Sequence, residues 1–345
     1  MRKILTITTV ISGVLISAAT NADDILTVYS SRSEPLIESL LEKFTEATQI
    51  ETQILTDEAP NLIARLESEG DATPADLFLP ADVSNMAAAA DKGLLGEVES
   101  DVLMANIPAE YRDADNKWFG LGKRVRAIIY NKEKINPETD LSTYEDLADP
   151  KWKGQILART SSHPYNLSLI AAMITADGAE KTEAWVNGIV TNLARPPQGG
   201  DRDQIKAVAA EEGTIAIANS YYYAMLLNSE VPEEKAAAEA TGIYFPNQDA
   251  SEGELSGAHV NLSGAGVTAH SDSPENAVKL LEFLSSPEAQ KIYAEANQEY
   301  PVNPEVAPSA TLQSFGEFKA DTTPLHVFVD NIDEAIQMTD RSGWK

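Results

Sequence analysis

The chain has 345 residues, no cysteine, and 54 Asp and Glu against 26 Lys and Arg, which gives a formal net charge of −28. Without cysteine, disulfides, thiolate metal sites and cysteine nucleophiles are excluded. So acidic a protein is unsuited to nucleic acid or anionic lipid, because both carry negative charge themselves. The negative charge attracts cations in general, but it also increases solubility, so it does not identify a particular ligand.

The first 22 residues have the layout of a secretory signal peptide. A basic start at Arg2 and Lys3 precedes a short apolar run, and small residues surround Ala22. The run is too short and too close to the N-terminus for a secure membrane span, and no later stretch is long and apolar enough to be one. We therefore expect residues 1–22 to be removed from a soluble, exported protein without stable membrane insertion.

From residue 24 onward, segments typical of strands alternate with segments typical of helices. Leu36, Leu40 and Phe44, for example, fall on one helical stripe. An order of strand, helix, strand, helix, strand predicts a parallel sheet with helices on its faces. The first such unit comprises predicted strands at 24–30, 52–55 and 75–80 and predicted helices at 35–48, 59–70 and 83–93.

A second unit of the same kind begins near residue 123. Ser142 and Glu145 are spaced as a capping box, and Ser273 and Ser286 each precede a proline, which is typical of a helix start. Because single cores stop growing below the length of this chain, we expect two lobes. The second unit comprises predicted strands at 123–131, 153–160 and 213–220 and predicted helices at 166–178, 179–190 and 202–213.

Four predicted strand ends carry residues that suit a binding site. In open α/β sheets, ligands collect outside the carboxyl ends of the strands, and two lobes suggest a cleft between them. The candidate residues are Tyr29, Arg32 and Glu34 after the first strand, Arg124 and Arg126 on the strand "KRVRAIIY", His163 and Tyr165 in "RTSSHPYN", and Tyr221, Tyr222 and Tyr223 in "NSYYYA".

The charged candidates differ in what they indicate. Arg124 and Arg126 are two apart and share a face of a strand that should be buried, and a buried guanidinium needs an anionic partner. His163 precedes a proline and is more typical of a turn, while the other histidines are scattered. No HExxH or comparable pair is present, so a zinc site of the usual kind is not expected.

The clustered tyrosines have two interpretations. Tyr165 and the run Tyr221–Tyr223 could form an aromatic patch, either in a core or as a wall for an organic ligand. They could also be oxygen ligands, because a phenol becomes phenolate at neutral pH beside a strong Lewis acid. Fe(III) is acidic enough, whereas calcium and magnesium prefer carboxylates and carbonyls. Three phenolates would balance a 3+ charge, and a small anion such as carbonate, held by the arginines, or water would fill the open octahedral positions.

Longer stretches of the chain resemble the periplasmic ferric-iron-binding proteins of bacteria, the solute receptors of iron(III) ABC importers. They include "WFGLGKRVRAIIYNK", "ARPPQGGDRDQIKA", "IANSYYYA" and "AEANQEYPV", and the similar stretches together run from Val28 to Lys345. The resemblance implies an α/β fold of two lobes, the type II periplasmic-binding fold, with parallel-rich sheets and a hinge of two crossing strands. It places residues 23–121 and about 247–300 in the N-terminal lobe, and residues 122–246 and about 301–345 in the C-terminal lobe.

The resemblance also implies a set of site residues. The iron ligands fall on Tyr165, Tyr221 and Tyr222, and Tyr223 is expected just behind them or in the pocket wall. In members that bind a synergistic anion, the arginines that hold it resemble Arg32 and Arg124 in this chain. Arg126 is the alternative to Arg124.

The chain departs from the family pattern just after the first strand. Many members have histidine there, or histidine and tyrosine, whereas this chain has Ser33, Glu34 and Pro35. The N-terminal lobe is therefore expected to offer no direct ligand, which favours three tyrosines with an anion or water. Glu34, Asp57 and Glu58 remain candidate ligands from that lobe.

The function that the resemblance implies is a monomeric periplasmic receptor. It would capture Fe(III), close its lobes and deliver the ion to an ABC permease with its ATPase, without catalytic turnover. One alternative is a receptor of the same fold for an organic or anionic solute, such as a polyamine, a phosphonate or an iron chelate, with the tyrosines as an aromatic wall. Another is an exported hydrolase, but no GxSxG is present, since Asn261 and Ala265 stand where glycines belong.

Overall fold

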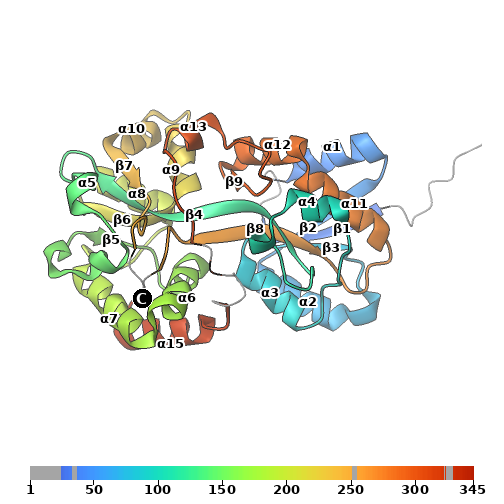
Figure 1. Ribbon diagram of the computed structural model, residues 1–345, viewed down its shortest axis with the longest axis horizontal. Coiled ribbons are helices and arrows are strands. Elements are labelled where there is room, and N and C mark those ends of the chain that lie inside the picture. Colours follow the sequence, from blue (N-terminus) through green and yellow to red (C-terminus); the bar gives the residue numbers. More distant parts are fainter. Residues whose placement is uncertain (1–24, 33–36, 251–254, 322, 324–328) are drawn as a thin grey trace, which may run out of the picture.

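Figure 1 shows the protein as a computed structural model with two α/β lobes joined by two long strands. The structure describes residues 25–32, 37–250, 255–321, 323 and 329–345. The predicted signal peptide and Glu34 lie outside these residues. Every helix within them is too short or too polar to cross a bilayer.

The first lobe is built on three parallel strands. Strand β1 lies between β2 and β3, with Val28 opposite Ile54 on one side and Leu77 on the other. Apolar residues at helical spacing, such as Leu40 and Phe44, bury one face of each helix against this sheet. Its elements are β1 (Ile25–Ser30), α1 (Glu38–Thr48), β2 (Glu51–Thr56), α2 (Ala59–Glu69), β3 (Leu77–Leu79), α3 (Val83–Asp91), α4 (Asp101–Asn106), α11 (Pro274–Ser285) and α12 (Pro287–Asn297).

The second lobe is built around two short parallel strands. Strands β5 and β6 are parallel, and helices α6, α7 and α15 pack together on one side of them. Its elements are α5 (Pro137–Asp140), β5 (Ile156–Leu157), α6 (Pro164–Asp177), α7 (Ala179–Asn192), α8 (Asp201–Ala209), β6 (Ile215–Asn219), α9 (Ser220–Leu227), α10 (Pro232–Ala240), β7 (Thr241–Tyr244), α13 (Ala310–Gln313) and α15 (Ile332–Ser342).

Two antiparallel strands, β4 (Phe119–Asn131) and β8 (Val260–Val267), connect the lobes (Figure 1). The first half of β4 pairs with β8, and its second half pairs with β6 and β7, so one strand belongs to both lobes. The short strand β9 (Tyr300–Pro301) also pairs with β4. One sheet, in the order β2-β1-β3-β8-β4-β6-β5, therefore runs through both lobes. The exact lobe boundaries stay a prediction.

Most predicted elements are confirmed, but two local predictions are wrong. The Ser142–Glu145 capping box does not form, because the neighbouring Thr143 accepts the N–H of Asp146 instead (3.2 Å). That segment is a single 3₁₀ turn, 145–148, before a second at Pro150–Trp152. The predicted strand at 153–160 pairs only at β5. The helix starts at Pro274 and Pro287 are confirmed.

A buried tyrosine joins β4 to β8 where the two strands separate. The hydroxyl of Tyr144 accepts the N–H of His259 (3.0 Å) and donates to the carbonyl of Arg126. The indole N–H of Trp185 in turn donates to the carbonyl of Tyr144 at 2.6 Å. Because Tyr144 is fully buried, water cannot replace these bonds, and its hydroxyl fixes the start of the second lobe to the connecting strands.

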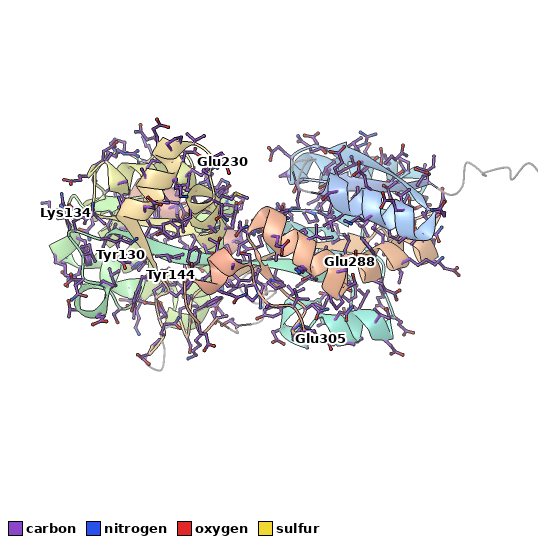
Figure 2. All side chains as sticks on the ribbon, turned by 90° about the horizontal axis from the view of Figure 1, so that it is seen from above. Tyr130, Lys134, Tyr144, Glu230, Glu288 and Glu305 are labelled. Atoms are coloured by element: carbon purple, nitrogen blue, oxygen red, sulfur yellow. The ribbon has the colours of Figure 1, made fainter. Side chains whose placement is uncertain are left out.

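We expect Tyr144→Phe to lower the free energy of unfolding by about 1–3 kcal/mol, since it leaves buried backbone groups without their partner. Urea denaturation would measure the change. Tyr130→Phe is the matched control, because Tyr130 lies in the same lobe (Figure 2) and its half-buried hydroxyl has no hydrogen bond to any described residue. Equal losses in the two variants would contradict the role given to Tyr144.

Candidate metal centre

The three predicted tyrosines reach one point from two helix starts. Tyr221 and Tyr222 lie in the first turn of α9, which follows β6 directly. Tyr165 lies in the first turn of α6, where Nδ1 of His163 accepts the N–H of Tyr165 at 3.3 Å and caps the helix. Pro164 suits this first position because it has no N–H to leave unpaired. The direct passage from β6 to α9 thus positions Tyr221 and Tyr222, and the capped start of α6 positions Tyr165.

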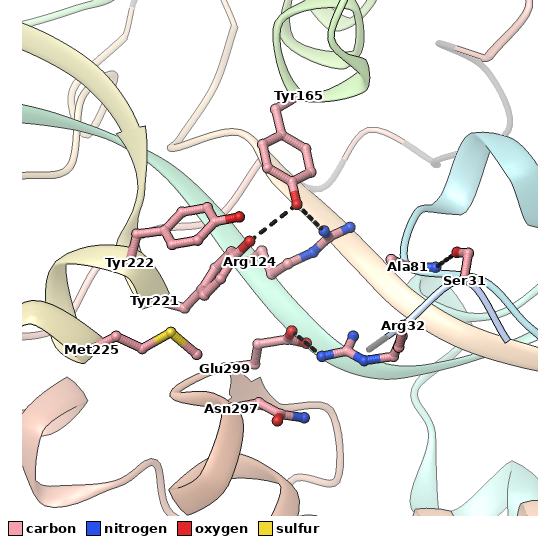
Figure 3. A pocket seen from close by; sticks show the side chains of 10 residues that line it. All are labelled: Ser31, Arg32, Ala81, Arg124, Tyr165, Tyr221, Tyr222, Met225, Asn297 and Glu299. Carbon is pink, nitrogen blue, oxygen red and sulfur yellow. Dashed lines mark hydrogen bonds and ion pairs between the residues drawn. The ribbon is translucent and has the colours of Figure 1, made fainter. Parts of the chain in front are cut away.

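The hydroxyl ends of these tyrosines meet in one pocket (Figure 3). The oxygens of Tyr165 and Tyr221 are 3.0 Å apart, and the ring centroids of Tyr221 and Tyr222 are 4.0 Å apart. The pocket has a volume of about 200 Å³. It is lined by Ser31, Arg32, Ala81, Arg124, Tyr165, Tyr221, Tyr222, Met225, Asn297 and Glu299.

Arg124 and Arg32 both line this pocket. From β4, Arg124 donates to the hydroxyl oxygen of Tyr165 (3.2 Å) and to Asn261 Oδ1 on β8 (3.2 Å). Arg32 follows β1 and donates to Glu299 Oε1 at 2.7 Å. Both guanidinium groups are almost completely buried. The two cations therefore stand beside the phenols with carboxylate or amide partners already in place.

Arg126, the alternative to Arg124, lies outside the pocket. It forms a buried ion pair with Asp201 (2.6 Å) and donates to Asn166 Oδ1 (2.7 Å) and Asn219 Oδ1 (3.2 Å). Asn166 follows Tyr165 in α6, and Asn219 is the residue at which α9 begins. Arg126 thus joins the starts of the two helices that carry the phenols.

Of the two places predicted for Tyr223, the pocket wall is wrong, because the ring lies behind α9. About 100° separates neighbouring residues on a helix, which turns this ring away from the pocket into a core between α9 and α10. Its hydroxyl donates to the carbonyl oxygens of Thr241 (2.7 Å) and Ala238 (3.1 Å). Tyr221 and Tyr222 therefore line the pocket, whereas Tyr223 packs in the core behind them.

The two described candidates from the first lobe do not reach the pocket. Asp57 is exposed at the start of α2, and its Oδ1 accepts from the N–H of Glu58 and from Asn61. Glu58 is exposed beside it. Among the described parts of the chain, no group of three or more His, Asp or Glu is arranged to hold a metal ion. The phenol oxygens that line the pocket are the candidate donors.

Burial controls the charge of these phenols. It raises the pKa of Tyr221 well above the ordinary value, and the neighbouring Tyr165 and Tyr222 add to the effect. Burial, followed by the proximity of Tyr165, raises the pKa of Tyr222 to about 12. Both phenols therefore keep their protons at neutral pH until a strong Lewis acid displaces them.

Similar proteins identify the family of this chain. Residues 39–320 match the family described as bacterial extracellular solute-binding protein. The chain belongs to this family of solute-binding proteins. The match covers most of the chain and both lobes.

Several relatives of this solute-binding protein are iron proteins. Iron uptake protein A1 of Synechocystis sp. is 45% identical over 320 residues, which cover 93% of this chain and 87% of that protein. A Trichodesmium protein, solved in complex with iron and citrate ligands, has a TM-score of 0.88 at 45% identity and covers 93% of this chain and 100% of its own. The ferric binding protein from Campylobacter jejuni has a TM-score of 0.86 at 40% identity, with coverage of 93% and 100%. These structures confirm the predicted two-lobed fold of type II.

Sequence reasoning missed Glu299, which lies between α12 and β9. Its carboxylate is 2% exposed and lines the pocket beside Arg32. The only local signal is an acidic residue placed directly before the strand residues Tyr300 and Pro301, in the stretch "NQEYPV". An acidic side chain is almost never fully buried without a partner, so that position could have been singled out.

We expect Asp201→Asn to destabilise the solute-binding protein by about 3–5 kcal/mol, because it leaves the buried Arg126 without its counter-charge. Arg159, which pairs with the same carboxylate at 3.2 Å, loses its partner as well. Urea denaturation would measure the effect, and Asp115→Asn, at an exposed carboxylate, is the control. A change no larger than that of the control would show that Asp201 is not required to hold the helix starts.

Proposed function

We propose that this solute-binding protein is a periplasmic receptor for Fe(III). Tyr165, Tyr221 and Tyr222 bind the ion as phenolates, and the loaded receptor delivers it to the permease and ATPase of an ABC importer. The convergence of the phenol oxygens carries the proposal, since two of them lie 3.0 Å apart in one pocket. The relatives at 41–45% identity, which are named as iron uptake proteins, support it.

The chemistry of the donor set favours a trivalent ion. Phenols whose pKa is raised bind only a cation acidic enough to displace their protons, and Fe(III) meets that condition. Three phenolates neutralise its charge. In this proposal, a small anion such as carbonate, held by Arg32 and Arg124, or water completes the coordination shell.

The geometry of the pocket is unfavourable for an aromatic wall around an organic solute. Hydroxyl ends rather than ring faces line it (Figure 3), and its volume of about 200 Å³ is smaller than the roughly 300–1,000 Å³ usual for organic ligands. Capture and delivery need no bond to be made or broken in a substrate. The proposed protein is a monomeric, exported receptor rather than an enzyme.

Replacing two of the proposed ligands should abolish the site. Titration with Fe(III) should give a visible charge-transfer band of ferric phenolate, and the Tyr221→Phe, Tyr222→Phe double variant should lose the band and at least about 100-fold in affinity, more than a change behind a ligand costs. Tyr223→Phe is the matched control and should keep the band, because its hydroxyl lies outside the pocket. An unchanged band in the double variant would move the iron site elsewhere.

Iron affinity should fall as the pH is lowered. Tyr221 and Tyr222 hold their protons when free of metal, so each binding event releases protons and an acidic medium opposes it. With Tyr221 and Tyr222 both ionising, the dissociation constant should rise by about 100-fold for each unit of pH below neutrality. Competition with a chelator of known proton affinity would measure this dependence. An affinity that does not change with pH would contradict phenolate ligation.

A further inference from the structure

Glu299 is a buried carboxylate at the pocket that the proposed function does not yet use. Its side chain is 2% exposed, and Oε1 accepts from Nη2 of Arg32 at 2.7 Å. Its other oxygen, Oε2, accepts from the hydroxyl of Ser263 on β8 at 2.7 Å. Both carboxylate oxygens are thus held by donors from the first lobe and the connecting strands, as Figure 3 shows for Arg32.

The backbone of β4 leaves room for this carboxylate at one glycine. A Cβ added to Gly122 would lie 2.3 Å from Glu299 Oε2 and 2.7 Å from the ring of Tyr293. Such distances are far inside van der Waals contact, so any side chain at position 122 would expel the carboxylate. The place of Glu299 is therefore built into the strand that connects the two lobes.

The buried charges of the pocket balance without an added anion. Arg32 is matched by Glu299, and the second guanidinium, Arg124, lies 3.7 Å from the carboxylate of Asp82. Burial raises the pKa of Glu299, but Arg32 and then Arg124 outweigh it, so the pKa is lowered overall and the group is ionised at neutral pH. Two cations thus face two carboxylates, while three phenolates face one Fe(III).

We infer that Glu299 is a built-in counter-anion, which occupies the side of Arg32 that a small exogenous anion such as carbonate would otherwise take. Iron binding then needs no added anion, and water fills the remaining coordination positions. A second anion beside this pair would add uncompensated negative charge in a buried site, which is strongly unfavourable. The inference rests on the proposed function as an iron receptor.

The Glu299→Gln substitution removes the negative charge of this side chain while nearly preserving its shape, so it tests the role of the charge alone. The glutamine keeps the size and one acceptor oxygen, but it leaves Arg32 and Arg124 with an excess positive charge that a small anion can neutralise. We expect wild-type iron affinity to be the same with and without bicarbonate or inorganic phosphate. In E299Q, affinity in anion-free buffer should fall about tenfold or more, and either anion should restore it. Glu305→Gln, at an exposed position, is the control and should behave as wild type.

A second measurement does not depend on iron. Phosphate should raise the melting temperature of metal-free E299Q, because it binds the folded state there, and should leave metal-free wild type unchanged. Glu299→Asp keeps the negative charge and should retain iron binding without added anion. A merely structural role would instead make E299D and E299Q fail in the same way.

These experiments distinguish failure of the proposed iron-receptor function from failure of the inference about Glu299. If wild type gives no ferric phenolate band, the proposed function falls, while the melting experiment still tests the anion site. If wild-type iron binding requires bicarbonate or phosphate, Glu299 does not replace the anion, whatever the variants do. If E299Q shows neither anion-dependent iron binding nor stabilisation by phosphate, the inference is likewise overturned.

Discussion

The positive charge buried on strand β4 is the constraint on which the rest of the pocket depends. A guanidinium in a dry interior is tolerated only with counter-charges and acceptors around it. Arg126 pairs with Asp201 and donates to the two asparagines at the helix starts, which aligns α6 with α9. Arg124 lies 3.7 Å from the carboxylate of Asp82 and donates to acceptors on β8 and to the phenol of Tyr165. Two side chains on one face of one strand thereby position the helix starts that carry the phenols of the second lobe and tie them to the connecting strands.

Local patterns in the sequence were enough for the architecture and for the position of the pocket. Strands and helices alternate with clear periodicity, and the rule that ligands gather at strand ends gave a wider set of candidates. The resemblance to ferric-iron-binding proteins narrowed that set to Tyr165, Tyr221, Tyr222, Arg32 and Arg124, which all line one pocket. What local patterns could not distinguish was the task of neighbouring residues. Arg124 and Arg126 have the same spacing and face on their strand, so the sequence cannot tell which of them lines the pocket. Arg126 instead pairs with Asp201, which is 75 positions away in the chain.

Long-range pairing also explains why Glu299 was missed. It is 267 positions from Arg32 in the chain, and nothing in its surroundings signals that pairing. For a related reason, the sequence could not decide between the two places predicted for Tyr223. Its place behind α9 depends on where the carbonyls of Ala238 and Thr241 lie. The predicted capping box at Ser142 is wrong because the neighbouring Thr143 accepts a backbone N–H of this turn instead. Spacing alone cannot decide which of the two hydroxyl groups does so.

All three phenols belong to helices of the second lobe, and this has a consequence for how cargo would leave. Drawing the lobes apart would uncover the bound ion but would break none of its bonds to the tyrosine oxygens. A transporter that merely pulled such a receptor open would face an ion still fully attached to one half. Unloading would therefore require a competing chemical event at the exposed ion, such as proton uptake by the phenolates, transfer to a stronger acceptor, or reduction to a less acidic oxidation state.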